Sequence, residues 1–239
     1  MWQTSEMWGE ELASAVMSGR VAFVAGELDE LANPQKAAAM AAYMKTDMPF
    51  YGVQKKARDG VYEEMLRRFP VGSRREYTTA VVELWQRPHR EEKYLAVGLA
   101  KAYSQYQTVG SLPLYRKLIV EGAWWDFVDE IAINLVGAVW LRHRERTTPM
   151  IERWVDDDDM WLRRSAIVGQ LKHKTETDEA LLFDFCLRRA GEREFFIRKA
   201  IGWALREYAK TAPDAVRAFV TSHEEAWSGL TFREATKHL

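Results

Sequence analysis

Apolar residues recur along the chain with the period of an α-helix. The clearest case is the phrase AWWDFVDEIAINLVGAVWL, where one narrow arc of the helical wheel holds Trp124, Val128, Ala132, Leu135 and Val139. No alternating strand pattern of useful length occurs, and all seven prolines lie at or beside the ends of predicted helices. The pattern therefore predicts an all-α protein in which each helix packs one side against a core.

The same reading predicts helices along almost the whole chain. They cover residues 1–19, 20–32, 35–45, 55–69, 74–86, 89–106, 112–121, 124–142, 147–155, 160–172, 177–190, 194–209, 212–221 and 230–238. We expect a single domain over 1–239, because nothing in the sequence forces two. Residues 1–19 are an N-terminal extension to which we attach no function.

Tryptophans indicate an internal repeat. Trp85, Trp125, Trp161 and Trp203 are separated by 40, 36 and 42 residues, close to the period of about 40–47 residues of HEAT and armadillo units. Such helix pairs stack side by side and expose a concave face made from the same helix of each pair. We therefore predict a curved α-solenoid, or superhelix, of HEAT-like repeats.

Composition narrows the class of protein. Charged residues make up 29% and apolar residues 47% of the chain, without a run of about 18 apolar residues or a signal peptide, so we expect no membrane association. A lone Cys186 excludes an internal disulfide and fits a reducing compartment. The histidines lack metal-ligand spacing, and no glycine-rich phosphate loop or nucleophile signature occurs, so we expect no metal and no cofactor.

The concave face of the predicted solenoid would combine aromatic planes, arginines and one carboxylate. Its expected members are Trp125, Asp129, Trp161, Arg164, Trp203 and Arg206. Arginine forks can grip phosphate, whereas a carboxylate repels it and is useful only where positive charge develops. Breaking an N-glycosidic bond develops such charge on the sugar. The competing interpretation, that Asp129 pairs with an arginine and the tryptophans are core, remains open here.

Several phrases together resemble the DNA alkylation repair proteins, the AlkD-like DNA glycosylases. They occur in the same order and approximate spacing from about residue 21 onward, and they read ELWQRPHRE (83–91), WWDFVD (124–129), MWLRRSAI (160–167), EFFIRKAIGWALREYAK (194–210) and FREATKH (232–238). The resemblance implies a curved solenoid of HEAT-like repeats. It also implies a monofunctional hydrolase of base excision repair that removes N3- and N7-alkylated purines, of the 3-methyladenine and 7-methylguanine type, without drawing the base into a deep pocket.

The resemblance also implies roles for individual residues. Asp129 is similar to the catalytic aspartate, and Trp125 and Trp203 are similar to the two aromatic residues that flank the sugar of the lesion nucleotide. Because an alkylated purine already carries positive charge, the base can leave without a general acid. One carboxylate can then be sufficient.

DNA contacts are implied in the same way. Arg164 resembles the arginine that supports the DNA backbone near the site, and Arg206 and Lys210 resemble phosphate contacts. Tyr43 resembles a tyrosine that lines the cleft, and Gln54 a polar DNA contact. The expected partner is double-stranded DNA containing alkylated bases, bound by a monomer in the bacterial cytoplasm and nucleoid.

Two features depart from the family pattern or bear on DNA binding. Arg163 adds a second cation beside Arg164, and the acidic run 156–159 would repel DNA unless it lies in a loop that caps the helix starting near Met160. We favour the capping loop. Two alternatives stay open: a non-catalytic HEAT-like protein that binds bent or branched DNA, and a solenoid that binds proteins.

Overall fold

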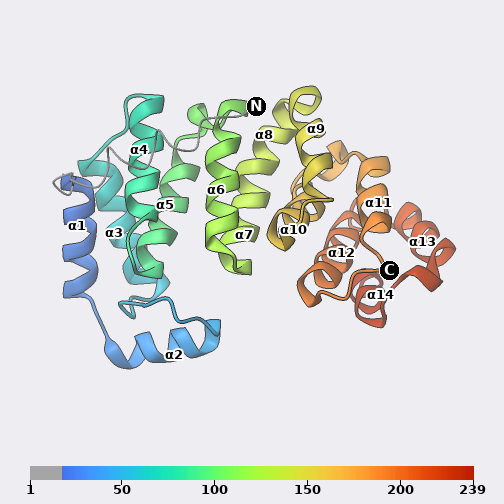
Figure 1. The fold of residues 1–239 in the computed structure, drawn as a ribbon, viewed down its shortest axis with the longest axis horizontal. Coiled ribbons are helices and arrows are strands. Elements are labelled where there is room, and N and C mark those ends of the chain that lie inside the picture. Colours follow the sequence, from blue (N-terminus) through green and yellow to red (C-terminus); the bar gives the residue numbers. More distant parts are fainter. Residues whose placement is uncertain (1–17) are drawn as a thin grey trace. The chain divides into compact units, whose positions relative to one another are not determined.

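The computed structural model describes residues 18–239, and within that range every regular element is helical (Figure 1). This confirms the predicted all-α class. The chain divides into two compact units, which end and begin at Tyr103 and Ser104. The predicted helix over 1–19 lies outside the described residues, and the single-domain assignment stays a prediction.

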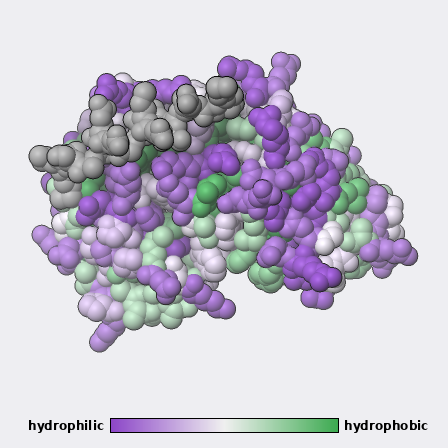
Figure 2. Space-filling model, viewed as in Figure 1, coloured by the Kyte–Doolittle hydropathy of each residue, from purple (hydrophilic) through white to green (hydrophobic). Residues whose placement is uncertain are grey.

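The described part of the first unit contains two packed helix pairs and one further helix. Its helices are α1 (Gly19–Glu30), α2 (Pro34–Met44), α3 (Lys55–Arg68), α4 (Arg74–Trp85) and α5 (Arg90–Ala102). Helices α4 and α5 pack against each other, and α1 and α3 pack together against this pair. Helix α2 buries only Met44 and leaves most of its alanine-rich surface exposed (Figure 2).

The second unit continues the pattern of paired helices with short one-turn connections. Its elements are η1 (Ser104–Tyr106), η2 (Val109–Ser111), α6 (Leu112–Gly122), α7 (Trp125–Ile131), the π-turn η3 (Ala132–Val136), α8 (Gly137–Arg142), α9 (Arg144–Trp154), α10 (Met160–Val168), η4 (Lys174–Glu176), α11 (Glu179–Arg188), α12 (Phe195–Tyr208), α13 (Pro213–Ser222), η5 (Glu224–Ala226) and α14 (Gly229–Ala235). Helix α10 contacts both α7 and α12, so it is the centre of the unit.

The hydrophobic stripe of the central helix is buried as its period predicts. Val128, Ala132, Leu135 and Val139 have no solvent exposure. The predicted helix 124–142 is not regular, however, because a π-turn separates α7 from α8. Trp124 precedes the first helical residue and has extended backbone angles. Hydrophobic periodicity alone does not reveal one extra residue in a helix, since both sides of this segment are apolar.

The prediction that every proline lies at a helix end is wrong for Pro149. Helix α9 starts at Arg144, so Pro149 lies inside it. A proline in a helix interior costs about 3 kcal/mol, because it lacks an N–H donor and clashes with the preceding turn. Burial of Thr147, Ile151 and Trp154 on the same helix offsets this cost.

The tryptophan repeat does not mark one equivalent position in each unit. Trp85 is the last residue of α4, Trp125 is the first of α7, Trp161 is the second of α10, and Trp203 lies in the middle of α12. Trp85 and Trp161 are buried core residues, whereas Trp125 is exposed. Similar lengths of consecutive helix pairs therefore produced the spacing, but two of the four side chains are buried and cannot contribute to an exposed face.

A buried carboxylate holds the loop between α2 and α3. Glu91 Oε1 accepts hydrogen bonds from the backbone N–H groups of Gly52 (2.9 Å) and Val53 (3.0 Å), and Oε2 accepts one from Tyr51 (3.1 Å). Gly52 has a φ of 86°, and a Cβ there would lie 2.1 Å from Asn33 O. Only glycine fits this turn, which leads directly into Gln54.

Glu91→Gln should lower the free energy of unfolding by about 1–3 kcal/mol. Glutamine replaces one carboxylate oxygen by an NH₂ group, which cannot accept a hydrogen bond, so at least one buried backbone N–H would lose its acceptor. Chemical denaturation measures this change. Glu63→Gln on α3 is the matched control, since Glu63 is exposed and the same substitution there should change stability by less than about 0.5 kcal/mol. Equal effects at both positions would contradict the role given to Glu91.

Candidate active site

Helix α7 begins with Trp125 and presents Asp129 one turn later on the same side of the helix. Trp125 is 37% exposed, and Phe195 is the other large aromatic residue of this unit that is exposed. Asp129 is more enclosed, with 14% of its side chain accessible to solvent. The first two turns of α7 therefore place an accessible indole beside a nearly buried carboxylate.

Arg164 on α10 holds the Asp129 carboxylate through a two-pronged ion pair. Its Nε donates to Oδ1 at 2.7 Å and its Nη2 donates to Oδ2 at 2.7 Å. The third nitrogen, Nη1, donates to the backbone oxygen of Phe196 on α12 at 2.6 Å. One guanidinium thus ties α7, α10 and α12 together, and its planar geometry fixes the orientation of the carboxylate.

Two opposing effects act on the proton affinity of Asp129. Burial raises the pKa of its carboxyl above the usual value, and the hydrogen bonds and positive charge of Arg164 oppose part of that rise. A carboxylate in this environment is a stronger local negative charge than an exposed one, because little water screens it.

Aromatic side chains support this ion pair from one side. The rings of Trp124, Trp161 and Phe196 contact one another at centroid distances of 5.0–6.1 Å. The Arg164 guanidinium lies 6.0 Å from the Phe196 ring. Trp161 is buried in this cluster, so its predicted place on an open binding face is wrong. Trp161 lies on the same helix as the buried residues Leu162, Ala166 and Ile167, and it faces the core with them.

Helix α12 carries three further predicted residues. Trp203 is partly exposed and lies next to Gly202, where a Cβ would lie 2.4 Å from the Glu234 side chain on α14. Arg206 is not a free cation, since it forms an ion pair with Glu234, which also binds Lys199 at 2.8 Å. Lys210 is more accessible and pairs with Glu207 at 2.7 Å. Their roles as phosphate contacts stay predictions.

In the first unit, Tyr43 and Gln54 line one open groove with a volume of about 440 Å³. Tyr43 is 78% exposed at the end of α2, and Gln54 precedes α3. Three cations that we did not predict line the same groove, namely Lys36, Lys55 and Arg58. The signal for Lys55 and Arg58 was the high density of lysine and arginine in the helix over 55–69, which by itself resembled an ordinary solvated surface. Lys36 lies in the preceding helix, where nothing in the sequence set it apart.

Arg163 points away from the Asp129 site, although it is adjacent to Arg164 in the sequence. It forms an ion pair with Glu192 at 2.8 Å and donates to the backbone oxygens of Asp157 and Asp158. Arg163 is therefore a structural cation that ties the loop before α10 to the loop before α12.

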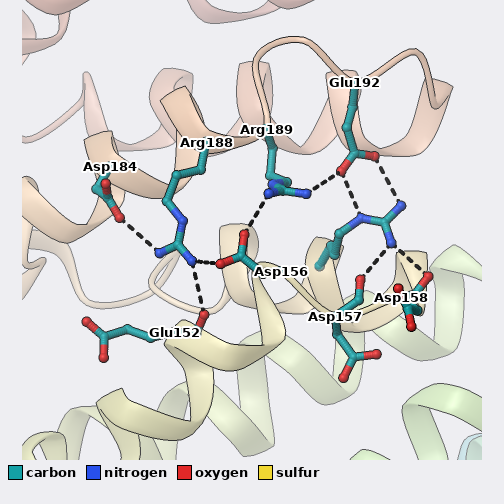
Figure 3. A network of polar contacts seen from close by, with 9 residues as sticks. Glu152, Asp156, Asp157, Asp158, Asp184, Arg188, Arg189 and Glu192 are labelled. Atoms are coloured by element: carbon teal, nitrogen blue, oxygen red, sulfur yellow. Dashed lines mark hydrogen bonds and ion pairs between the residues drawn. The ribbon is translucent and has the colours of Figure 1, made fainter.

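The acidic run lies in that loop, as we expected. The Asp159 carboxylate caps α10 by accepting hydrogen bonds from the N–H groups of Trp161 (2.8 Å) and Leu162 (3.1 Å). Asp156 instead binds Arg188, the last residue of α11, and Arg189, which follows it (Figure 3). Within the second unit, Asp159 therefore serves as a helix cap and Asp156 as an ion-pair partner.

These features define a class of protein: an all-helical repeat protein with an arginine-bound aspartate and an accessible tryptophan at the start of one helix. The model of the DNA alkylation repair enzyme family matches residues 24–239. The chain belongs to this family, and its role is therefore in the repair of alkylated DNA. No helix among residues 18–239 has the length and apolar content needed to span a bilayer.

Solved structures of similar fold agree with this assignment. A predicted DNA alkylation repair enzyme from Enterococcus faecalis has 29% sequence identity and a TM-score of 0.81, over 87% of this chain and 96% of that one. AlkD2 from Streptococcus mutans has 16% identity and a TM-score of 0.60, over 85% and 99% respectively, which shows the fold alone. No curated protein matches the chain.

Proposed function

We propose that the protein is a monofunctional DNA glycosylase that hydrolyses the N-glycosidic bond of N3- and N7-alkylated purines in duplex DNA. The observation that carries this proposal is the Asp129 carboxylate, which Arg164 holds at 2.7 Å on both oxygens beside an accessible Trp125. A carboxylate held in a fixed orientation, with little water around it, suits a reaction whose transition state develops positive charge.

The chemistry requires few protein groups. An alkylated purine carries positive charge, so the bond between the base and C1′ breaks with its electron pair going to the base, and no proton donor is needed. The sugar passes through an oxocarbenium-like state, and Asp129 stabilises that charge and orients the attacking water. Arg164 keeps the carboxylate ionised and aligned, because its charge opposes the effect of burial.

Binding uses aromatic planes and cations. The faces of Trp125 and Trp203 pack against the sugar of the lesion nucleotide and attract the cationic base, a contribution of about 0.5–2 kcal/mol per contact. Arg206, Lys210, Tyr43 and Gln54 contact the DNA backbone and grooves in this proposal. The nucleotide therefore reacts at an exposed surface, without entering a deep pocket.

The test is release of free base from synthetic duplexes that carry 7-methylguanine or 3-methyladenine. The proposal expects release with both substrates and none from undamaged DNA. Salt-sensitive binding to DNA junctions without any release would instead favour a non-catalytic protein that recognises branched DNA. Absence of any affinity for DNA would support a protein-binding solenoid.

Trp125→Ala should lower the single-turnover rate of base release by about 2–30-fold, the kinetic equivalent of one cation–π contact. Trp125→Phe should retain part of this rate, since phenylalanine offers a weaker aromatic face. Leu31→Ala is the control, because Leu31 is an exposed apolar residue of the first unit. If Trp125→Ala releases base at the wild-type rate, Trp125 does not contact the lesion nucleotide.

A further inference from the structure

The helix that carries Asp129 contains a π-turn that begins three residues after Asp129, at Ala132. At Ala132–Val136 the regular α-helical pattern is interrupted, and the N–H of Gly137 donates to the carbonyl oxygen of Ala132, five residues earlier. One additional residue changes the rotation between the two flanking segments by about 100° compared with an uninterrupted α-helix. The π-turn therefore sets the direction in which α7 presents Trp125 and Asp129 relative to α8.

Asn134 lies inside this turn, and its side chain forms hydrogen bonds to the end of α7 and to the segment that follows α10. Its Nδ2 donates to the backbone oxygen of Glu130 at 3.1 Å, the residue that follows Asp129. Its Oδ1 accepts from Lys172 Nζ at 2.5 Å, which lies in the segment after α10. The Asn134 side chain thus connects the backbone next to the carboxylate with a neighbouring helix pair.

His173 holds the end of the π-turn from the same segment. Its Nε2 lies 2.9 Å from Gly137 O, and a carbonyl oxygen only accepts, so Nε2 carries the proton. The ring is 3% exposed, and burial lowers the pKa of His173 to about 4, so it is neutral near pH 7. Its other nitrogen, Nδ1, has no hydrogen-bond partner among the described residues.

Next to this hydrogen bond, the backbones at Gly137 and Gly169 approach each other too closely to leave room for a side chain at Gly137. A Cβ on Gly137 would lie 2.3 Å from Gly169 O, the residue after the last of α10. The ring of Trp140 covers Gly169 and contacts His173 at a centroid distance of 5.7 Å. The start of α8 is therefore pressed directly onto the end of α10.

We propose that His173 and Asn134 are positioning residues that fix the π-turn, and through it the orientation of Asp129. The helix that carries Asp129 is then held at two points. Arg164 of α10 binds the Asp129 carboxylate before the π-turn, and Lys172 and His173, which follow α10, bind Asn134 in the turn and Gly137 at its end. This inference rests on the proposed glycosylase function, but its structural consequence can be measured without activity.

The kinetic test compares His173→Leu, which removes the donor, with His173→Gln, whose amide can still donate to Gly137 O. His173→Leu should lower the single-turnover rate of base release by about 10–100-fold, the scale of a small misplacement of a catalytic group. Its dissociation constant for undamaged DNA should change by less than about twofold, because no phosphate contact is removed. His173→Gln should recover most of the rate. Asn134→Ala should lower the rate of base release to a similar extent as His173→Leu.

A matched control separates positioning from simple destabilisation. Phe219→Leu changes a buried side chain of α13 in the same unit, so it should lower the melting temperature without slowing base release. If His173→Leu and Phe219→Leu reduce release in proportion to their loss of stability, or if His173→Gln fails to recover the rate lost by a folded His173→Leu, the positioning role is refuted.

A measurement independent of activity uses the ¹³C resonance of the Asp129 side-chain carboxyl, assigned with Asp129→Asn. His173→Leu should change its chemical shift and its titration, and His173→Gln should restore both. An unchanged resonance in folded His173→Leu refutes the inference. If wild type releases no base but the resonance responds as expected, the proposed glycosylase function fails while the positioning of Asp129 stands.

Discussion

Replacement of Asp129 by asparagine should lower the single-turnover rate of base release by about 10²–10³-fold, the usual cost of removing one preorganised electrostatic group from an active site. The amide has nearly the same shape as the carboxylate, but it has no negative charge to stabilise the oxocarbenium-like sugar. Release of 7-methylguanine from a labelled duplex, with enzyme in excess over DNA, measures the chemical step directly.

DNA affinity should not fall in the same variant. Asp129→Asn removes a negative charge, and affinity for DNA depends mainly on the balance of charge near the phosphates. Asp126→Asn makes the same change of charge nearby on α7 and should alter release only slightly. If Asp129→Asn and wild type release base at equal rates, Asp129 is a structural ion-pair partner and the catalytic proposal fails.

Arg164→Ala should lower the free energy of unfolding by about 3–5 kcal/mol, because it leaves a buried carboxylate without its partner. The Arg164 side chain is only 6% exposed and also satisfies the Phe196 carbonyl, so water cannot readily replace it. Urea denaturation followed by tryptophan fluorescence measures the loss.

The same substitution should shift the pH dependence of catalysis. Asp129 acts in its ionised form, so release falls as pH falls through the pKa of Asp129. Burial raises that pKa and Arg164 opposes the rise, so Arg164→Ala should move the acid limb of the pH–rate profile to higher pH.

Arg163→Ala is the matched control for this shift. It removes the neighbouring cation, which pairs with Glu192 instead of Asp129. Arg163→Ala should therefore cost stability through the network in Figure 3 but leave the acid limb where it is in wild type. A shift of the limb in Arg163→Ala but not in Arg164→Ala would contradict the pairing described here.

Much of the local structure could be predicted because it depends on short stretches of sequence. Helix starts follow from capping residues such as Asn33, Ser73 and Asp159, whose side chains satisfy N–H groups of the first turn. The buried stripe around Val128 follows from the 3.6-residue period. Family phrases also directed attention to Asp129 and Arg164, which the structure joins directly.

Other features required contacts between residues far apart in the sequence. Trp161 and Trp203 have similar positions in the tryptophan pattern, yet one is buried and the other is partly exposed. Adjacent Arg163 and Arg164 bind different carboxylates, because successive residues of a helix project in directions about 100° apart. Pro149 is accommodated inside a helix by packing that no local rule contains.

The sequence by itself therefore determined the helical class and most helix boundaries, since each depends on residues within one or two turns of one another. The choice of Asp129 as the candidate catalytic carboxylate came from the resemblance of phrases spread along the chain to the DNA alkylation repair family. Only the tertiary structure decided the π-turn beyond Asp129, the contact of Gly137 with Gly169, and the bond from His173 to Gly137 O. These depend on how closely two helices approach. That distance is set by packing between segments separated by more than thirty residues.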